Sequence, residues 1–194
     1  MGVQQAQAVG GARAGAAVGM IFGIQRAMTG GIGSASFTVD GVTVGALVAC
    51  NALGDVVDPV TGRVIAGART ADGGGLLDAH AALLRGEEAR PMLAGSNTTI
   101  GVVATDAVLT KVQAGRLATQ GHDGLARAIR PVHTLSDGDA LFALATGASG
   151  RSLGMMTLGA MAAEAVTQAV LRAVRAARTV NLGTVSLPAA GDFA

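Results

Sequence analysis

One threonine in this sequence stands where its hydroxyl could act as a nucleophile without a histidine partner. Thr98 follows Asn97, where a charged loop containing Pro and Gly runs into the apolar stretch TTIGVVAT. If Thr98 attacked the carbonyl of Asn97, the acyl group would move from nitrogen to oxygen and water would release it. Thr98 would then carry a free α-amine with a pKa of about 8, which could accept the hydroxyl proton. One residue would thus supply both nucleophile and base.

The position of Thr98 alone leaves a simpler interpretation open. Threonine is β-branched and is common at the start of a strand. Thr99 is a neighbouring hydroxyl and the less favoured nucleophile, because it would not follow the cut directly.

The cysteine and the histidines favour structural interpretations. The single cysteine, Cys50, lies in an apolar run and is interpreted as a small core side chain. His80, His122 and His133 show no metal-ligand spacing, so no metal site is predicted. We interpret His133 as a hydrogen-bonding residue that anchors its loop, in preference to a catalytic role. His122 is expected at a helix surface.

Composition excludes several classes of function. The chain has 194 residues with 14 Lys plus Arg against 13 Asp plus Glu, and it lacks Trp and Tyr. Nucleic-acid binding is not expected, because a basic excess and aromatic platforms are both missing. No uncharged apolar run is long enough for a membrane span, and no signal peptide is recognised, so we expect a cytoplasmic protein. The Gly-rich segment 1–33 contains no nucleotide-binding motif, and no cofactor is predicted.

The elements that must position Thr98 follow from local patterns. A hairpin with an Asp40-Gly41 turn is predicted over 34–51, followed by a polar loop and a short strand at 63–66. Further strands are predicted at 98–105 and 140–146, and a short strand after Val180. Helices are predicted at 76–85, from an N-cap at Thr110 to about Arg127, and at 152–178. The order of strands and helices indicates a single α+β domain, or a layered α/β fold, over 1–194.

Three stretches carry a resemblance to a known family. They are NTTIGVVATDAVLTKVQAGRLA from Asn97, HDGLARAIRPVHT from His122 and DGDALFALATG from Asp137, with GGIGSAS earlier in the chain. Together they resemble the P1-family peptidases, which include DmpA-type aminopeptidases, β-peptidyl aminopeptidases and the nylon-oligomer endo-hydrolase. The resemblance covers nearly the whole chain. It implies an αββα-like sandwich of the DmpA and ornithine acetyltransferase type, of which the N-terminal part is missing here.

The same resemblance implies the roles of individual residues. Thr98 would be the nucleophile, released by self-cleavage after Asn97, which divides the chain into 1–97 and 98–194. Asn51 would stabilise the oxyanion, for which an amide N–H donor is well suited. Asp137 and Asp139 would orient the α-amine of Thr98 and bind the amine of the substrate. The alternative for this pair is an Asp-Gly-Asp turn that holds its own backbone.

One position departs from the family pattern. Nylon-hydrolase-type members carry a Lys in the Gly-rich segment, and the corresponding residue here is Met20, which can neither donate a proton nor carry charge. The expected function is a self-cleaving amide hydrolase acting on a small amide, a short peptide or an oligoamide, as a homo-oligomer. Ornithine-acetyltransferase-like acyl transfer and an uncleaved, non-catalytic remnant of the fold remain the alternatives.

Overall fold

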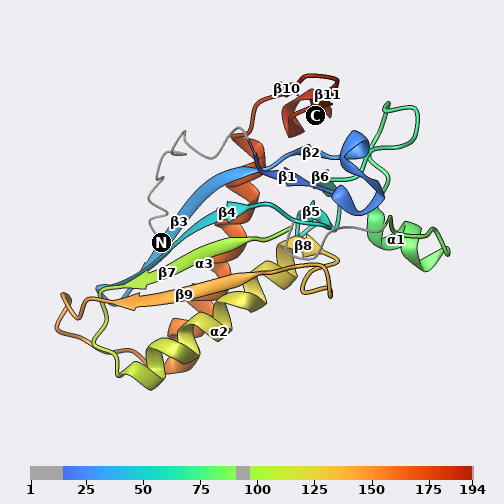
Figure 1. The fold of residues 1–194 in the computed structure, drawn as a ribbon. Coiled ribbons are helices and arrows are strands. Elements are labelled where there is room, and N and C mark those ends of the chain that lie inside the picture. The colour runs from blue at the N-terminus through green and yellow to red at the C-terminus, as the bar shows by residue number, and fades with distance from the viewer. Residues whose placement is uncertain (1–14, 91–96, 194) are drawn as a thin grey trace.

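The computed structural model describes residues 15–90 and 97–193. A four-stranded sheet forms its centre (Figure 1). The strands are β3 (Gly31–Val39), β4 (Val42–Cys50), β7 (Ile100–Thr105) and β9 (Ala140–Ala145), in the order β3-β4-β7-β9. β3, β4 and β7 pair antiparallel, whereas β9 joins parallel to β7.

The β3–β4 hairpin matches the sequence prediction. Asp40 and Gly41 take φ of 48° and 76°, which a tight hairpin turn requires and which Asp and Gly tolerate. Val39 pairs with Val42 across the turn, so the register is fixed from the first residue pair. Buried side chains alternate along β4 from Val42 to Cys50, which places one face of the sheet in the core.

Two helices cover that face of the sheet (Figure 1). α2 (Lys111–Ala128) starts at the predicted N-cap, because Thr110 accepts the backbone N–H of Gln113 in a capping box. α3 (Met155–Arg175) packs along β3, β4 and α2. The close approach depends on glycine: a Cβ on Gly124 of α2 would lie 2.3 Å from the carbonyl oxygen of Ala163 in α3.

The opposite face of the central sheet carries exposed apolar side chains. Leu47, Ile100, Phe142 and Leu144 are 43–64% exposed, which is unusual for large hydrophobic residues on neighbouring strands. Among the described residues the central sheet is therefore covered by helices on one face only, in a mixed α/β arrangement that confirms the predicted fold class.

Smaller elements gather at the end of the sheet where β4 ends and β7 and β9 begin (Figure 1). A second sheet has the order β6-β5-β8, with β5 (Asp55–Val57), β6 (Val64–Ala66) and β8 (Ile129–Arg130). β5 lies where the sequence predicts a polar loop, and tertiary pairing to β8 explains the difference. The remaining elements are β1 (Ala17–Val18), the 3-10 turns η1 (Met20–Phe22) and η2 (Ile24–Arg26), β2 (Met28–Thr29), α1 (Ala79–Leu84), β10 (Val180–Leu182), β11 (Val185–Leu187) and η3 (Ala190–Phe193).

The other predicted boundaries differ only modestly. α1 is shorter than the helix predicted at 76–85 because Asp78 caps it by accepting the N–H of Ala81. The tail forms a hairpin of two short strands, where one strand is predicted. Residues 1–14 of the Gly-rich segment, and Pro91 and Gly95 of the predicted loop, lie outside the described residues. No helix in the described part is both long and apolar enough to cross a membrane.

Candidate active site

Strand register brings the predicted site residues to one end of the central sheet. Ala49 of β4 pairs with Ile100 of β7, so continuing this antiparallel register places Asn51 opposite Thr98. Ile100 also pairs with Ala140 of β9, and the parallel register continues to a bridge between Asn97 and Asp137. Segments 47 and 40 residues apart in sequence (Asn51 to Thr98 and Asn97 to Asp137) therefore meet around Thr98.

The backbone of the 137–139 turn is hydrogen-bonded to the backbone around Thr98. The N–H of Gly138 donates to the carbonyl oxygen of Asn97 at 3.0 Å, and the N–H of Ala140 donates to the carbonyl oxygen of Thr99 at 3.1 Å. A Cβ on Gly138 would lie 2.7 Å from Oγ1 of Thr98, so the hydroxyl lies directly against this glycine. Asn97 is buried and Thr98 is partly exposed. This arrangement gives the Asn97 carbonyl a fixed N–H donor and leaves the Thr98 side chain partly accessible.

Asp139 occupies a buried position on the core side of this junction. Its Oδ1 accepts the backbone N–H of Thr99 at 2.9 Å, and its side chain is only 3% exposed. Cys50 lies nearby, fully buried, and burial together with the charge of Asp139 raises the pKa of its thiol to about 12. Cys50 is therefore a protonated core side chain, as predicted from the sequence.

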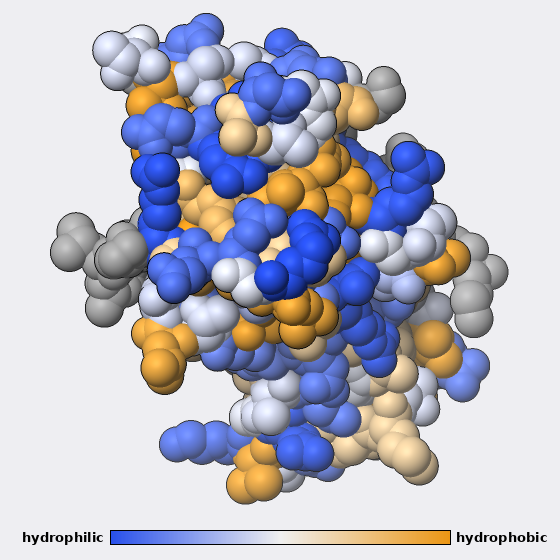
Figure 2. All heavy atoms as spheres, turned by 90° about the vertical axis from the view of Figure 1, so that its right-hand side faces the viewer, coloured by the Kyte–Doolittle hydropathy of each residue, from blue (hydrophilic) through white to orange (hydrophobic). Residues whose placement is uncertain are grey.

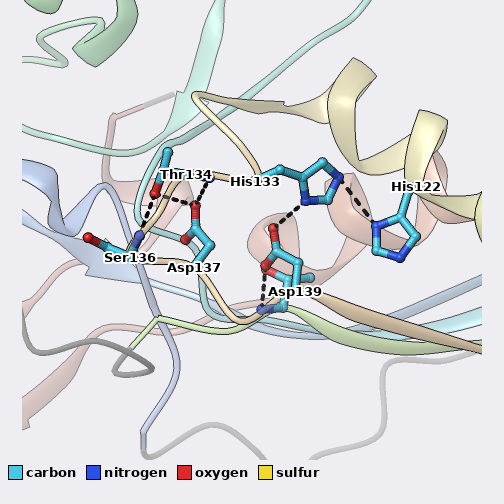
Figure 3. Close-up of polar contacts among 7 residues, drawn as sticks. His122, His133, Thr134, Ser136, Asp137 and Asp139 are labelled. Atoms are coloured by element: carbon cyan, nitrogen blue, oxygen red, sulfur yellow. Dashed lines mark hydrogen bonds and ion pairs between the residues drawn. The ribbon is translucent and has the colours of Figure 1, made fainter.

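Asp137 holds the loop that precedes β9. Its Oδ2 accepts both the backbone N–H of Thr134, at 2.9 Å, and the hydroxyl of Thr134, at 2.8 Å, while its own N–H donates to the carbonyl of Thr134 (Figure 3). These contacts are those of a loop-stabilising aspartate, the alternative that the sequence leaves open for this residue.

The side chain of Asn51 is oriented by the N-terminal segment. The backbone N–H of Ala17 donates to Oδ1 of Asn51 at 3.0 Å. Because the amide oxygen faces Ala17, the two N–H groups of the amide point to the other side. Val18 forms a parallel bridge with Ala52, which fixes the same segment beside the end of β4.

Met20 follows in this segment and is only 6% exposed. It belongs to a cluster of apolar side chains that includes Ile21, Phe22 and Leu53. Met20, the residue that the family resemblance places at a Lys position, is thus part of the apolar packing here.

A pair of histidines completes the site and was not predicted as a unit. Nδ1 of His133 lies 3.0 Å from Oδ2 of Asp139, and Nε2 of His133 lies 3.3 Å from Nδ1 of His122 in α2 (Figure 3). His133 is a hydrogen-bonding loop residue, as expected: its hydrogen bond is to His122, and its other ring nitrogen lies at ion-pair distance from the site carboxylate. His122, expected at the helix surface, is partly buried against it. His133 lies beyond the end of α2 at Ala128, so helical periodicity does not indicate its contact with His122.

No group of three or more His, Cys, Asp or Glu side chains suited to a metal ion occurs in the residues that the structure describes.

Figure 2 looks onto the end of the molecule where the site lies and shows hydrophobic residues gathered in its middle, framed by hydrophilic side chains. The chemistry available here is therefore that of a hydroxyl, a backbone N–H donor, a buried carboxylate and an imidazole pair.

Comparison with known proteins identifies the family of this chain. The model of peptidase family S58 matches residues 2–185. An uncharacterized aminopeptidase of Mycobacterium leprae is 42% identical over 181 residues, covering 86% of this chain and 49% of that protein. The 6-aminohexanoate-oligomer endohydrolase of Paenarthrobacter ureafaciens is 34% identical over 158 residues, covering 74% of this chain and 44% of that protein.

A solved aminopeptidase structure has a similar fold. The β-aminopeptidase of a Burkholderia species superposes with a TM-score of 0.54 at 26% identity, covering 84% of this chain and 46% of that one. The fold of this chain is therefore that of a known aminopeptidase structure. This chain belongs to peptidase family S58. It spans about half the length of the curated relatives it matches.

Proposed function

We propose that this protein is a self-cleaving amide hydrolase in which Thr98 becomes the N-terminal nucleophile. The observation that carries the proposal is the hydrogen bond from the N–H of Gly138 to the carbonyl oxygen of Asn97, at 3.0 Å. Attack by Oγ of Thr98 on this carbonyl would place negative charge on the oxygen that Gly138 already contacts. A fixed backbone donor is the kind of group that stabilises such an oxyanion.

Self-cleavage would proceed in two steps. In the first, a bond forms between Oγ of Thr98 and the carbonyl carbon of Asn97, the peptide C–N bond breaks, and the hydroxyl proton passes to the departing nitrogen. In the second, water hydrolyses the ester, which leaves a carboxylate on Asn97 and a free hydroxyl and α-amine on Thr98. No cofactor takes part in either step.

Turnover of a substrate would reuse the same groups. The α-amine of Thr98 takes the hydroxyl proton as Oγ attacks the substrate carbonyl, and water then resolves the acyl-enzyme. Asn51 donates from its amide to the oxyanion, and its orientation by Ala17 supports this role. Asp137 and Asp139 orient the α-amine and receive the amine of the substrate. Their contacts with Thr134 and Thr99 support a fixed position on either side of Gly138.

The substrate class follows from the relatives. A small amide, a short peptide or an oligoamide is proposed, because relatives are named as aminopeptidases and as an endohydrolase of 6-aminohexanoate oligomers. Cleaved protomers are proposed to assemble as homo-oligomers.

The decisive experiment is the intact mass of the purified full chain under denaturing conditions, beside a Thr98→Ala control. We expect two fragments, one ending at Asn97 and one starting at Thr98, that are absent from the control. Steady release of p-nitroaniline from amino-acid p-nitroanilides, without an added amine, then identifies a hydrolase. Turnover that requires an amine acceptor would identify acyl transfer instead. A single uncut chain in both samples would contradict the proposal and identify a non-catalytic member of the family.

A further inference from the structure

A continuous chain of polar contacts runs from α2 to the residue after Thr98 (Figure 3). His122 contacts His133 through Nδ1 and Nε2 at 3.3 Å, and Nδ1 of His133 contacts Oδ2 of Asp139 at 3.0 Å. The other carboxylate oxygen of Asp139 accepts the N–H of Thr99 at 2.9 Å. Each group in the chain thus restrains the next one, ending at the backbone that carries Thr98.

Burial makes His133 important to Asp139. The Asp139 side chain is 3% exposed, whereas that of His133 is 40% exposed. A buried carboxylate must be compensated by hydrogen bonds or an opposite charge. His133 contacts Oδ2 of Asp139 from the solvent side, and the backbone N–H of Thr99 donates to Oδ1.

The backbone of His133 shows that its position is constrained. Its φ is 56°, in the left-handed region that non-glycine residues adopt seldom, although Asn, Asp and His adopt it more often than the others. Such a conformation persists when surrounding contacts hold it, and it is often found at functional sites. The adjacent Thr134, bound by Asp137 through two hydrogen bonds, provides part of that hold.

We propose that His133, supported by His122, is a positioning residue that clamps Asp139 and makes the chemistry at Thr98 dependent on pH. The inference rests on the proposed function. The clamp holds while one of the two facing nitrogens, Nδ1 of His122 or Nε2 of His133, carries a hydrogen and the other accepts it. It opens when both rings are protonated, because two N–H donors then face each other across the contact.

The surrounding charges fit this behaviour. The pKa of His122 is held below its usual value, first by burial and then by repulsion from His133, while Asp139 and Asp123 act in the opposite direction. Asp137 lies in the same loop as His133, and the thiol of Cys50, from β4, lies near Asp139.

Two substitutions at His133 separate its role in holding Asp139 from the effect of protonating its ring. Asn in place of His133 suits the left-handed backbone. Its amide nitrogen is bonded to Cγ, as Nδ1 of His is, so His133→Asn keeps an N–H at the same distance along the side chain but does not titrate. His133→Gly also suits the backbone but removes the donor. We expect His133→Gly to slow self-cleavage and lower kcat by about tenfold with little change in KM, since the ring contact with the buried Asp139 carboxylate is lost. His133→Asn should restore most of the rate.

The pH profile distinguishes a clamp from a merely structural histidine. Protonation of the α-amine alone gives log kcat a slope of about one per pH unit on the acid side. In the unmodified protein the opening of the clamp adds to this slope below about pH 6, near the ordinary range of histidine titration. His133→Asn should keep the slope near one throughout. The same steepening in His133→Asn, or unchanged kcat in His133→Gly, would overturn the proposal.

An NMR titration tests the clamp without any activity. The pKa of His122 should rise in His133→Asn, where the repelling ring is gone, and fall in Asp139→Asn, where the attracting carboxylate is gone. His80→Gln assigns the third histidine signal. If the His122 pKa stays unchanged in both variants, the clamp does not exist, even if the enzyme cleaves itself. If the shifts occur in a chain that never cleaves, the proposed function fails and the clamp stands.

Discussion

Oγ1 of Thr98 lies so close to Gly138 that a Cβ at that glycine would come within 2.7 Å of it. The same glycine donates its N–H to the carbonyl of Asn97 at 3.0 Å. One residue without a side chain thus contacts both the proposed nucleophile and the carbonyl that this nucleophile would attack. The absence of a side chain is what allows the β9 segment to approach the junction so closely.

The first prediction concerns Gly138→Ala. The new methyl group must displace the Thr98 hydroxyl, the Gly138 N–H or both, so we expect self-cleavage to slow by about a hundredfold, the scale for loss of an oxyanion donor. Time-resolved intact mass measures the rate. Gly115→Ala is the matched control, because a Cβ at this helix position meets nothing within 4 Å. Equal cleavage rates in both variants would contradict the role given to Gly138.

The second prediction separates the two ends of the Asn51 amide. Asn51→Asp keeps an oxygen that can accept the N–H of Ala17 but removes the N–H donors on the other side. We expect kcat for p-nitroanilide hydrolysis to fall by about a hundredfold or more, while the melting temperature changes little. If hydrolysis persists at the original rate, Asn51 does not stabilise the oxyanion.

The third prediction concerns Asp55, a fully buried carboxyl in β5. It accepts the N–H groups of Ala68 and Ala79, yet burial outweighs these bonds and raises its pKa to about 6 from 3.8. The folded state therefore binds the proton more tightly than the unfolded state does. The contribution of Asp55 to stability is full below about pH 4 and declines as pH rises to about 6, by about 3 kcal/mol in total.

Urea unfolding of the unmodified protein and Asp55→Asn between pH 4 and pH 7 tests this prediction. Asn does not titrate, so the difference in unfolding free energy between the two proteins isolates Asp55. That difference should shrink as pH rises. A difference independent of pH would show that the carboxyl is charged throughout this range.

The fourth prediction concerns the thiol of Cys50. Because it is buried and its pKa is raised to about 12, almost none of it is thiolate at neutral pH. A disulfide reagent should leave the folded protein unlabelled for hours and modify one thiol after urea denaturation. Thr98→Ala serves as the control, since its labelling should match. Rapid labelling of the folded protein would show that the β4 end is open to solvent.

Local patterns in the sequence were enough for much of the fold. The Asp40-Gly41 turn and the Thr110 N-cap were predicted correctly, because each depends on residues next to it in the chain. The family was recognised from the stretch that begins at Asn97, and the match over residues 2–185 confirms it. The cleavage site and the residue roles stay predictions.

The tertiary structure decided what contacts these residues. The parallel pairing of β9 with β7 brings Gly138 to Asn97, and no sequence pattern specifies which strands become neighbours. The same is true of His122 and His133, because their contact depends on how α2 packs against the sheet. The sequence by itself determined the family and, through that resemblance, the candidate nucleophile Thr98, because the motif that carries it is a continuous stretch of chain. The donor and the carboxylate clamp beside it arise from strand register and helix packing, which couple residues distant in the chain.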